Sequence, residues 1–490
     1  MVRLRRATAI LLVGLCGAFL LVYLSIALSR MGYPYELEWM EGGMVAHVER
    51  VVTGQPIYAK PSIDFVSFLY PPLYYEAAAL FARVLGPGFL PLRLLSFLSS
   101  LGVFALLFAI VRRESGSAFS GAVAAGLFAA TYGRVGGWFD LARLDSFYLL
   151  TLLAAIYVLR FAKSRSSGAI AGLLIGAAFL TKQSALVIAF ALVIETSIAD
   201  MRRAPWFASA AALSIGGGVL FLDRSSGGWF HYYCVYLPSN HPRIGGGWAA
   251  FWTTDLLPAL PIATLLAVYY AASRIRADGG RTRFFFAAVA AGTIGSSWSV
   301  RNMVGAEVNN LLPAFAAVAM LAALGLDDLA RRARATDRAG WTRIALAAEI
   351  LILAQLAWLR YDPRKQLPTA ADRAAGDRVV ARLNAIPGEI FVPHHGYLAR
   401  LAGKREHAHT LAMDNVFLDD EGPARRDLEA ELLKALAEKR FAAVLLESDG
   451  RYGPAILNSY EVRGPLFESD DVFWPVTGGA LRPEFLCLPK

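Results

Sequence analysis

Residues 33–76 read YPYELEWMEGGMVAHVERVVTGQPIYAKPSIDFVSFLYPPLYYE and follow directly on a hydrophobic N-terminal segment. Three carboxylates, Glu36, Glu38 and Glu41, stand at the mouth of that segment. Carboxylates are costly to hold near lipid, so such acids either face water or serve a chemical task. A helix-like run, a Gly-Gln-Pro turn and a Pro-Pro-aromatic cluster complete the stretch. The pattern indicates a folded loop at the end of a membrane span. Whether its acids only face water or take part in chemistry depends on the residues elsewhere in the chain.

The composition is typical of a polytopic membrane protein. Of 490 residues, 56% are hydrophobic and 18% are charged, and the mean hydropathy is +0.46. A soluble protein needs more charge on its surface than this. The net charge of +9 comes largely from arginines in short clusters between apolar runs, a pattern typical of cytoplasmic loops that face anionic lipid. The expected partner is therefore the lipid bilayer and not nucleic acid.

About eleven segments approach the ~20 apolar residues that a helix needs to cross a membrane. The first lacks a small-x-small cleavage site before a polar start and is interpreted as a retained helix. The predicted fold class is a polytopic α-helical membrane protein with about 11 transmembrane helices. The predicted segments are 8–29, 92–111, 117–133, 146–161, 168–181, 183–199, 206–222, 255–273, 284–300, 309–327 and 343–360.

Lysine and arginine collect in alternate loops between these segments, which fixes an orientation by the positive-inside rule. The N-terminus is expected in the cytoplasm and the C-terminal segment outside, in a multi-pass protein of a bacterial cytoplasmic (inner) membrane. The outer loops carry the unusual polar and aromatic residues, so the chemistry is expected on the outer face. The basic inner loops hold Arg3/Arg5/Arg6, Arg112/Arg113, Lys163/Arg165, Arg202/Arg203, Arg274/Arg276/Arg281/Arg283 and Arg331/Arg332/Arg334/Arg338. The outer loops are 30–91, 134–145, 181–184, 223–254 and 301–308.

Two domains are expected, a transmembrane domain over residues 1–361 and a small extracytoplasmic α/β domain over residues 362–490. The first outer loop, 30–91, is too long for a simple connector. It is expected to hold two amphipathic helices on the membrane, near Gly42–Thr53 and Leu73–Leu85, separated by the Pro-Pro break. In the C-terminal segment, helix-like runs alternate with the strand-like runs EIFVPH and AAVLLES, which favours an α/β arrangement.

The loop GRVGGWFDLARLDSF places Arg143 between two carboxylates, Asp140 and Asp145. An arginine with two acids at the membrane surface could bind a phosphate and accept a proton from an acceptor group. Asp145 has a simpler interpretation, as the N-cap of the fourth segment. The sequence leaves both interpretations open.

Two further groups lie at the ends of later segments. Lys182, in the tip Thr181-Lys182-Gln183, could neutralise a phosphate as a point charge, or its ammonium could reach out to the membrane interface. The run SVRNMVGAEVNNLLPAF opens the tenth segment with Arg301, Glu307, Asn309 and Asn310. Asn and Glu at this position also suit helix capping.

Aromatic residues in two outer loops are candidates for substrate binding. Tyr70, Tyr74 and Tyr75 lie in YPPLYY, and His231 lies in WFHYYCVYLPSNHPR. Aromatic rings with hydroxyl groups suit sugar recognition, and they equally suit an aromatic belt at the membrane interface. The YPPLYY run is expected to form a wall of a substrate-binding groove.

No metal or cofactor motif stands out in the chain. His394, His395, His407 and His409 cluster in the C-terminal segment, but adjacent histidines do not easily face one ion, and no HExxH or CxxC accompanies them. A P-loop and a GxGxxG fingerprint are also missing from the sequence. The three cysteines imply no disulfide framework and are expected to be unpaired. The candidate site residues are expected to need no cofactor, and a divalent metal ion is optional.

Together these motifs resemble those of GT-C-type membrane glycosyltransferases. The likeness is strongest to the bacterial family of protein O-mannosyltransferase-like and aminoarabinose-transferase-like enzymes. The shared features are the acidic pair after the first span, the turn with its Pro-Pro-aromatic stretch, the Arg-x-Asp, the Thr-Lys tip and the Asn-rich entry to a late span. They read LEWMEGG, GQPIY with YPPLYY, ARLDS, LTKQS and EVNNLLPAF, in the family's order over roughly residues 1–330.

The resemblance implies transfer of a sugar from a polyprenyl-phosphate-linked donor to a glycan, lipid or protein acceptor outside the cytoplasmic membrane. A carboxylate would take the proton from the acceptor hydroxyl, with Glu41, Glu38 and Asp145 as candidates. Arg143, Lys182 and Arg301 would offset charge on the leaving phosphate in an inverting displacement.

Many members of the family carry Asp-Glu in the first loop, where this chain has Glu38-Trp39-Met40-Glu41-Gly42. Glu41 is favoured as the base because it opens the helix-like run, with Glu38 second. The sugar and the type of acceptor are not specified by these motifs.

Two other functions compete with a transferase. A transporter or flippase of a lipid-linked or small polar substrate would hold ionisable groups near the bilayer midplane and tends to show repeated halves. In this chain the charges gather at the outer ends of segments, and no internal repeat is evident. A non-catalytic scaffold that presents the C-terminal domain would tolerate substitution of the outer-loop acids.

Overall fold

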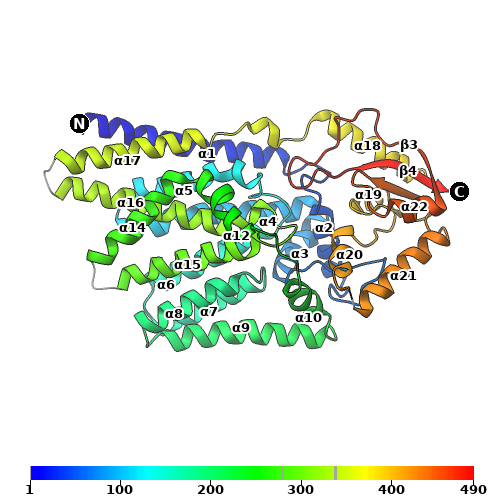
Figure 1. The fold of residues 1–490 in the computed structure, drawn as a ribbon, viewed down its shortest axis with the longest axis horizontal. Helices are drawn as coiled ribbons and strands as arrows, with labels where there is room; N and C mark the ends of the chain where they lie inside the picture. Colours follow the sequence, from blue (N-terminus) through cyan, green and yellow to red (C-terminus); the bar gives the residue numbers. More distant parts are fainter. Residues whose placement is uncertain (1, 278–280, 336–338, 421) are drawn as a thin grey trace.

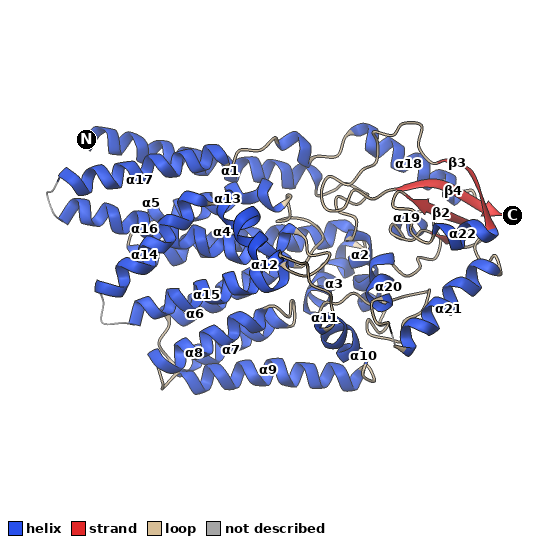
Figure 2. Ribbon diagram, viewed as in Figure 1, coloured by secondary structure: helices blue, strands red, loops and turns tan. Residues whose placement is uncertain are grey.

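Long helices fill one half of the molecule, and a small sheet with shorter helices fills the other (Figures 1 and 2). The computed structural model describes residues 2–277, 281–335, 339–420 and 422–490. The N-terminus lies at the free end of the helical half and the C-terminus at the opposite end of the molecule (Figure 1). The chain therefore leaves the helical half at its last long helix and ends in the sheet.

Each of the eleven predicted segments overlaps one long or medium helix. A short 3₁₀ turn, η1 (Thr131–Val135), extends α5 and leads into the loop before α6. The helices are α1 (Val2–Arg30), α4 (Phe89–Ser115), α5 (Ala118–Ala130), α6 (Asp145–Phe161), α7 (Arg165–Phe179), α8 (Ala185–Ala199), α9 (Ala204–Ser225), α14 (Pro261–Ala277), α15 (Arg281–Arg301), α16 (Leu312–Ala335) and α17 (Ala339–Trp358).

Five helices of the described chain are long and apolar enough to cross a membrane, and a bent helix pair makes up to six. The five are α1, α4, α9, α16 with the turn before it, and α17, while α7 and α8 are shorter apolar helices. Eleven membrane crossings therefore stay a prediction. The orientation of the chain in the membrane also stays a prediction. Two of the basic loops on which it rests include residues 278–280 and 336–338, which lie outside the described residues.

The eighth predicted segment, 255–273, begins too early. Residues 247–259 form a separate arm of α12 (Gly247–Ala250), a π-helical stretch η3 (Phe251–Leu256) and α13 (Leu257–Ala259). This arm meets α14 at a bend of 100°. A proline disfavours helical backbone in the residue before it, and Leu260, just before Pro261, has left the helical region. The straight helix of this segment therefore starts at Pro261.

The first outer loop contains two helices close to their predicted positions, α2 (Glu41–Val52) and α3 (Leu73–Leu85). Pro72 precedes the first residue of α3, where a missing N–H costs nothing, and Gly86 ends it with a positive φ of 81°. The apolar face of α2, with Met44, Val45 and Val48, is fully buried. The helix is therefore covered by protein on that face.

The C-terminal segment folds into a four-stranded sheet with helices around it. The strand order is β1-β2-β4-β3, with β1 parallel to β2 and the other neighbouring pairs antiparallel. The runs EIFVPH and AAVLLES contain β1 and β2, whereas β3 and β4 were not predicted from the sequence. The elements are η5 (Pro363–Gln366), α18 (Ala370–Asn384), β1 (Ile390–Phe391), α19 (Tyr397–Leu401), α20 (Thr410–Phe417), α21 (Pro423–Ala437), β2 (Ala443–Glu447), α22 (Gly453–Ser459), β3 (Tyr460–Pro465) and β4 (Pro483–Pro489).

The C-terminal segment does not have a core of its own. One cluster of buried side chains combines residues of the first outer loop and α3, such as Met44 and Tyr75, with residues of the sheet and its helices, such as Phe391 and Val444. Arg440 adds an ion pair to Asp64 of the loop, with 2.8 Å between Nη2 and Oδ1. A domain boundary at residue 361 stays a prediction for the chain, but the packing is continuous across it.

The outer loop after α9 forms a short helical stretch against the C-terminal segment. It consists of α10 (Trp229–His231), the π-helical η2 (Tyr232–Tyr236) and α11 (Leu237–Ser239). Tyr233 is buried and donates a hydrogen bond to the carbonyl of Ala59 at 3.1 Å. A last 3₁₀ turn, η4 (Val308–Leu311), leads into α16 and brings Asn309 and Asn310 to the same end of the helices as the first loop.

Candidate active site

Glu38 and Arg143 form a buried ion pair between the first outer loop and the loop before α6. Arg143 Nη1 donates to Glu38 Oε2 at 3.1 Å, and Arg143 Nη2 donates to the hydroxyl of Tyr70 at 3.2 Å. The guanidinium also lies over the rings of Tyr70 and Trp138, 5.8 and 5.7 Å from their centres. Among the described residues, Glu38 Oε1 and Arg143 Nε have no hydrogen-bond partner. The ion pair thus leaves one carboxylate oxygen and one guanidinium nitrogen without a partner in the described chain.

The environment of Glu38 favours its protonated form more than water would. Burial raises the pKa of the Glu38 carboxyl to about 8, although the charge of Arg143 acts in the opposite direction. The nearby carboxylates Glu41 and Glu36 add to the upward shift. A carboxyl with a pKa near neutrality can both accept and release a proton, as a general base must.

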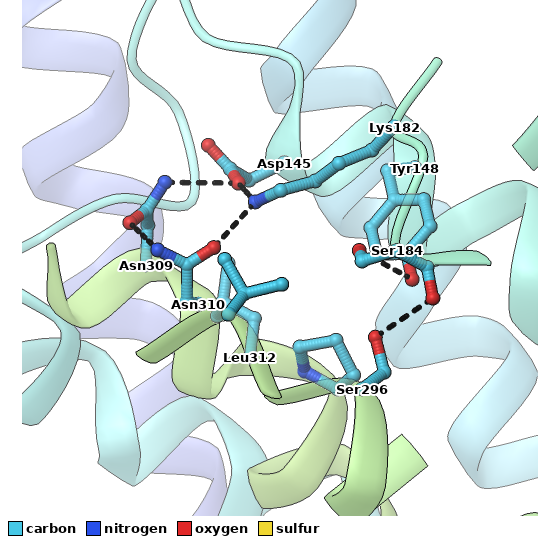
Figure 3. A pocket seen from close by; sticks show the side chains of 10 residues that line it. Asp145, Tyr148, Lys182, Ser184, Ser296, Asn309, Asn310 and Leu312 are labelled. Carbon is cyan, nitrogen blue, oxygen red and sulfur yellow. Dashed lines mark hydrogen bonds and ion pairs between the residues drawn. The ribbon is translucent and has the colours of Figure 1, made fainter. Parts of the chain in front are cut away.

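Lys182 holds together a second cluster, drawn from α6, the tip between α7 and α8, and η4 (Figure 3). Its ammonium donates to Asp145 Oδ1 at 2.7 Å and to Asn310 Oδ1 at 2.9 Å. Asn309 donates to the same oxygen of Asp145 at 3.0 Å, and Asn310 donates to Asn309 Oδ1 at 3.2 Å. The other oxygen of Asp145, Oδ2, has no partner in the described part of the chain.

Two simpler interpretations of these residues do not apply. Asp145 is the first residue of α6, but its side chain makes no capping bond and turns to Lys182 instead. The ammonium of Lys182 does not reach the outside, because the residue is only 8% exposed. A cavity of about 10 Å³, room for about one water, lies beside them and is also lined by Tyr148, Ser184 and Ser296. These three residues were not predicted from the sequence. They lie inside apolar helices or at their ends, where no motif marks them.

The two clusters are adjacent because Arg143 and Asp145 are two residues apart, and their charges attract each other. Ser96 of α4 fixes the turn between them by donating to the carbonyl of Arg143 at 2.8 Å. Tyr74 in turn hydrogen-bonds to Ser96, with 3.0 Å between the hydroxyls. Among the described residues, Tyr74 is therefore connected to Arg143 through Ser96 and makes no direct hydrogen bond to it.

Glu41 is engaged by a different arginine, Arg93 of α4. Its Oε1 accepts from Arg93 Nε at 3.0 Å and from the N–H of Ala142 at 2.6 Å, and its Oε2 accepts from Arg93 Nη2 at 2.6 Å and from the N–H of Leu37 at 2.7 Å. Burial raises the pKa of the Glu41 carboxyl, but Arg93 and these N–H groups outweigh it and hold the pKa below its usual value. Glu41 thus accepts four hydrogen bonds, whereas Glu38 keeps one oxygen without a partner among the described residues.

Asp140 is held in a similar way by Arg30 at the end of α1. The guanidinium bonds to both oxygens at 2.8 Å, and the hydroxyl of Tyr132 donates to Oδ1 at 2.9 Å. Arg30 and Arg93 were not predicted as partners of the acids. Their position at the ends of apolar segments, where a charge is costly, was the signal that could have found them.

Of the remaining predicted residues, Glu307 contacts the Lys182 cluster only through its backbone carbonyl, and the others make their contacts outside the two clusters. Arg301 forms an ion pair with Asp255 at 3.0 Å and donates to the carbonyl of Ala306. Glu307 accepts a hydrogen bond from Asn310 through its backbone carbonyl. The ring of Tyr75 stacks on His47, with 4.8 Å between centres. His231 is exposed and lines a separate groove beside the C-terminal segment.

The C-terminal segment reaches the Glu38 cluster through residues that the sequence did not indicate. Thr477 donates its N–H to the carbonyl of Leu37 at 3.2 Å and forms an isolated bridge with Glu38. Gly478 lies so close that an added Cβ would stand 2.9 Å from Glu38 Cγ, and its φ is +78°. The loop between β3 and β4 therefore covers one side of Glu38.

A polar cluster of histidines and acids lies next to this loop. His395 Nδ1 is 2.5 Å from Glu36 Oε2, and His394 Nε2 is 3.1 Å from Asp449 Oδ2. Burial lowers the pKa of His395. Within the described ranges, no three His, Cys, Asp or Glu side chains are arranged to hold a metal ion. His395 connects the first loop with the C-terminal segment, whereas His394 and Asp449 both belong to that segment.

Comparisons with known proteins agree with the resemblance seen in the sequence motifs. The profile of the dolichyl-phosphate-mannose-protein mannosyltransferase family matches residues 70–223. No curated protein sequence matches the chain. ArnT from Cupriavidus metallidurans, in a crystal structure bound to undecaprenyl phosphate, superposes with a TM-score of 0.59 at 13% identity, over 96% of this chain and 98% of that one.

The oligosaccharyltransferase of Archaeoglobus fulgidus, in a crystal structure with a tethered acceptor peptide, is also similar. Its TM-score is 0.54 at 13% identity, over 91% of this chain and 72% of that one. The oligosaccharyltransferase AglB from Archaeoglobus fulgidus, in complex with an inhibitory peptide and a dolichol-phosphate, gives a TM-score of 0.54 at 12% identity, over 87% of this chain and 69% of that one. The predicted resemblance to GT-C-type proteins is thus confirmed at the level of fold.

Proposed function

We propose that this chain, which has the fold of the GT-C-type membrane glycosyltransferases, transfers a sugar from a polyprenyl-phosphate-linked donor to an acceptor. The observation that carries the proposal is the pairing of two cations, Arg143 and Lys182, with two carboxylates, Glu38 and Asp145, that each keep one oxygen without a partner among the described residues. Such an arrangement suits a reaction in which a hydroxyl loses a proton and a phosphate departs.

Glu38 acts as the base in this proposal. Its unpartnered Oε1 takes the proton of the acceptor hydroxyl while the oxygen attacks the anomeric carbon. The bond from that carbon to the phosphate oxygen breaks in the same step, so a single displacement inverts the anomeric centre. Arg143 stabilises the carboxylate that accepts the proton, because the two are already paired at 3.1 Å.

Lys182 and Arg143 bind the phosphate and offset the charge that develops on it as it leaves. Asp145 and Asn310 hold the ammonium of Lys182 in place through two hydrogen bonds. Preorganised donors of this kind in a buried site are usually the largest contribution to catalysis. The leaving phosphate is already an anion, so no acid is needed to protonate it.

The lipid-linked donor is supported by what two similar proteins bind. The ArnT structure contains undecaprenyl phosphate, and the AglB structure contains a dolichol-phosphate. The acceptor is a glycan, a lipid or a protein, and the protein works in a bacterial cytoplasmic membrane with its C-terminal segment outside. A transporter is not favoured, because the matching profile and the matching folds are those of transferases.

The proposal is tested by deleting the gene and comparing the cell-envelope glycans by mass spectrometry. Deletion is expected to remove one sugar from a glycan, and the wild-type gene is expected to restore it. Glu38→Gln should lower the transfer rate by ~100-fold or more, since a general base contributes 10²–10⁴-fold. Glu76→Gln, at an exposed site on α3, is the matched control and should restore the sugar fully. Full restoration by Glu38→Gln, at equal protein level, would overturn the assignment.

The reaction is proposed to need no metal ion. Arg143 and Lys182 supply the positive charge that a divalent cation supplies to the leaving phosphate in other enzymes. Treatment of the purified protein with EDTA should therefore leave the transfer rate unchanged. A loss of activity that Mg²⁺ or Mn²⁺ restores would contradict this part of the proposal.

A further inference from the structure

A groove separate from the reaction site lies between the α10–α11 stretch and the C-terminal segment. It has a volume of about 780 Å³, within the ~300–1,000 Å³ typical of small-molecule sites. We name it the aromatic groove, after the rings that line one wall. Its lining includes Trp229, His231, Tyr232, Tyr236, Asp419 and Asp427.

We propose that the aromatic groove binds a carbohydrate portion of the acceptor, as a neutral or amine-bearing glycan. This inference rests on the proposed transfer function and specifies the class of its acceptor.

The wall of the groove is a fixed pair of tyrosine rings. Tyr232 and Tyr236 stack with 5.7 Å between ring centres and 18° between planes. Both hydroxyls donate to Asp419, at 3.3 Å to Oδ2 and 3.2 Å to Oδ1, and Trp229 lies edge-on to Tyr232 at 5.4 Å. Ring faces carry negative potential, which attracts the polarised C–H groups of a sugar ring. A rigid aromatic platform of this kind suits a pyranose.

The charges of the groove select against a phosphorylated ligand. Asp419 and Asp427 line the groove together with one lysine, Lys60, whose ammonium is paired with Asp427 at 2.8 Å. Anionic groups would be repelled, whereas sugar hydroxyls or an amino group can donate to Asp419. An acyl chain has no hydrogen-bond donors to offer these carboxylates. The groove therefore suits a glycan better than a lipid tail or a headgroup phosphate.

The helical stretch of the groove is linked to the reaction site through Gln183. Gln183, next to Lys182, donates to the carbonyl of Leu69 at 2.5 Å and to that of Cys234 at 3.1 Å. Leu69 precedes Tyr70, whose hydroxyl contacts Arg143. The stretch that carries the tyrosine pair is thus tied to the backbone beside both cations. A glycan in the groove would be held by an element that is hydrogen-bonded to Gln183, the residue next to Lys182.

The test is binding of the full-length protein, purified in detergent, to an array of neutral, amine-bearing and phosphorylated glycans. Wild-type protein should bind a subset of the neutral or amine-bearing glycans. Tyr236→Ala, at an exposed ring, should weaken binding by about 3- to 10-fold, the size of one aromatic contact. Phe221→Ala removes a more exposed aromatic ring on α9, outside the groove, and should bind as wild type.

The outcomes separate this inference from the proposed function. Glu38→Gln should lower the transfer rate by ~100-fold or more and keep glycan binding, whereas Tyr236→Ala should raise the acceptor KM and leave kcat unchanged. Binding to no glycan, binding to phosphorylated glycans alone, or equal binding by Tyr236→Ala and wild type would each overturn the groove assignment. An aromatic belt at the membrane interface predicts the last of these results. Glycan binding without any transfer would instead overturn the proposed function.

Discussion

At the scale of single residues, two glutamates three positions apart have opposite surroundings. Glu41 accepts four hydrogen bonds and is paired with Arg93, while Glu38 has one oxygen without a partner in the described chain. A carboxylate that is fully engaged stabilises the fold but has no lone pair ready for a substrate proton. Position in the sequence favoured Glu41, and hydrogen bonding favours Glu38.

Glu41→Gln is expected to destabilise the protein strongly. The substitution leaves the buried Arg93 without its counter-charge, and breaking a buried pair by removing one partner costs ~3–5 kcal/mol. Thermal unfolding in detergent, with Glu76→Gln as the control, measures the change. Wild-type thermal stability in Glu41→Gln, together with lost transfer, would show that Glu41 acts in the reaction instead.

The rate of transfer is expected to rise with pH up to about 8 and then level off. Burial raises the pKa of Glu38 to about 8, and only the ionised form of a carboxyl can accept a proton. The base form is scarce below that pKa and prevails above it, so activity is lost as the pH falls. A profile of kcat/KM between pH 6 and 9 measures this effect, and a flat profile would exclude Glu38 as the base.

At the scale of elements, the loop between β3 and β4 reaches the acid across more than 400 residues of sequence. Gly478 is the point of closest approach, since an added Cβ would stand 2.9 Å from Glu38 Cγ and 3.1 Å from its Oε1. Only a glycine combines that approach with a φ of +78° at little cost. The loop therefore helps to set the position of the carboxylate.

Gly478→Ala is expected to lower kcat by up to ~100-fold, because small displacements of a reacting group are costly. Gly305→Ala is the matched control, since Gly305 has a similar φ of +75° and open space around it. Both variants carry the same backbone strain, so a difference in kcat reports the contact with Glu38. Equal kcat values in the two variants would show that the loop does not position the acid.

Elements with local signals were predicted well, and pairings between distant residues were not. Pro72 and Gly86 frame α3, so Leu73–Leu85 could be read from the sequence. The choice between Glu38 and Glu41 depends on Arg93 and Arg143, which lie 52 and 105 positions away from their partners. Periodicity carries no information on such pairs. The strands β3 and β4 were missed because exposed and buried residues do not alternate regularly along them.

At the scale of the whole molecule, the helical half and the sheet depend on a shared core. Residues 1–361 expressed alone are expected to be degraded, because the apolar face of α2 would be exposed. Co-expression of residues 362–490 as a second chain should restore the protein, as judged by its level in the membrane fraction. Accumulation of residues 1–361 alone with wild-type thermal stability would show that the helical half does not depend on the C-terminal segment for its stability.

The contact between Glu36 and His395 joins positions 359 residues apart and has a consequence for biosynthesis. At ~5–20 residues per second, the ribosome needs roughly 20 to 70 s to make the residues between them. Throughout that time the first loop is already made, and the surface that will cover it does not yet exist. Nascent chains at this stage present apolar residues such as Met44 and Val48 without cover. A chaperone on the side of the membrane where the loop emerges would protect the chain during this interval.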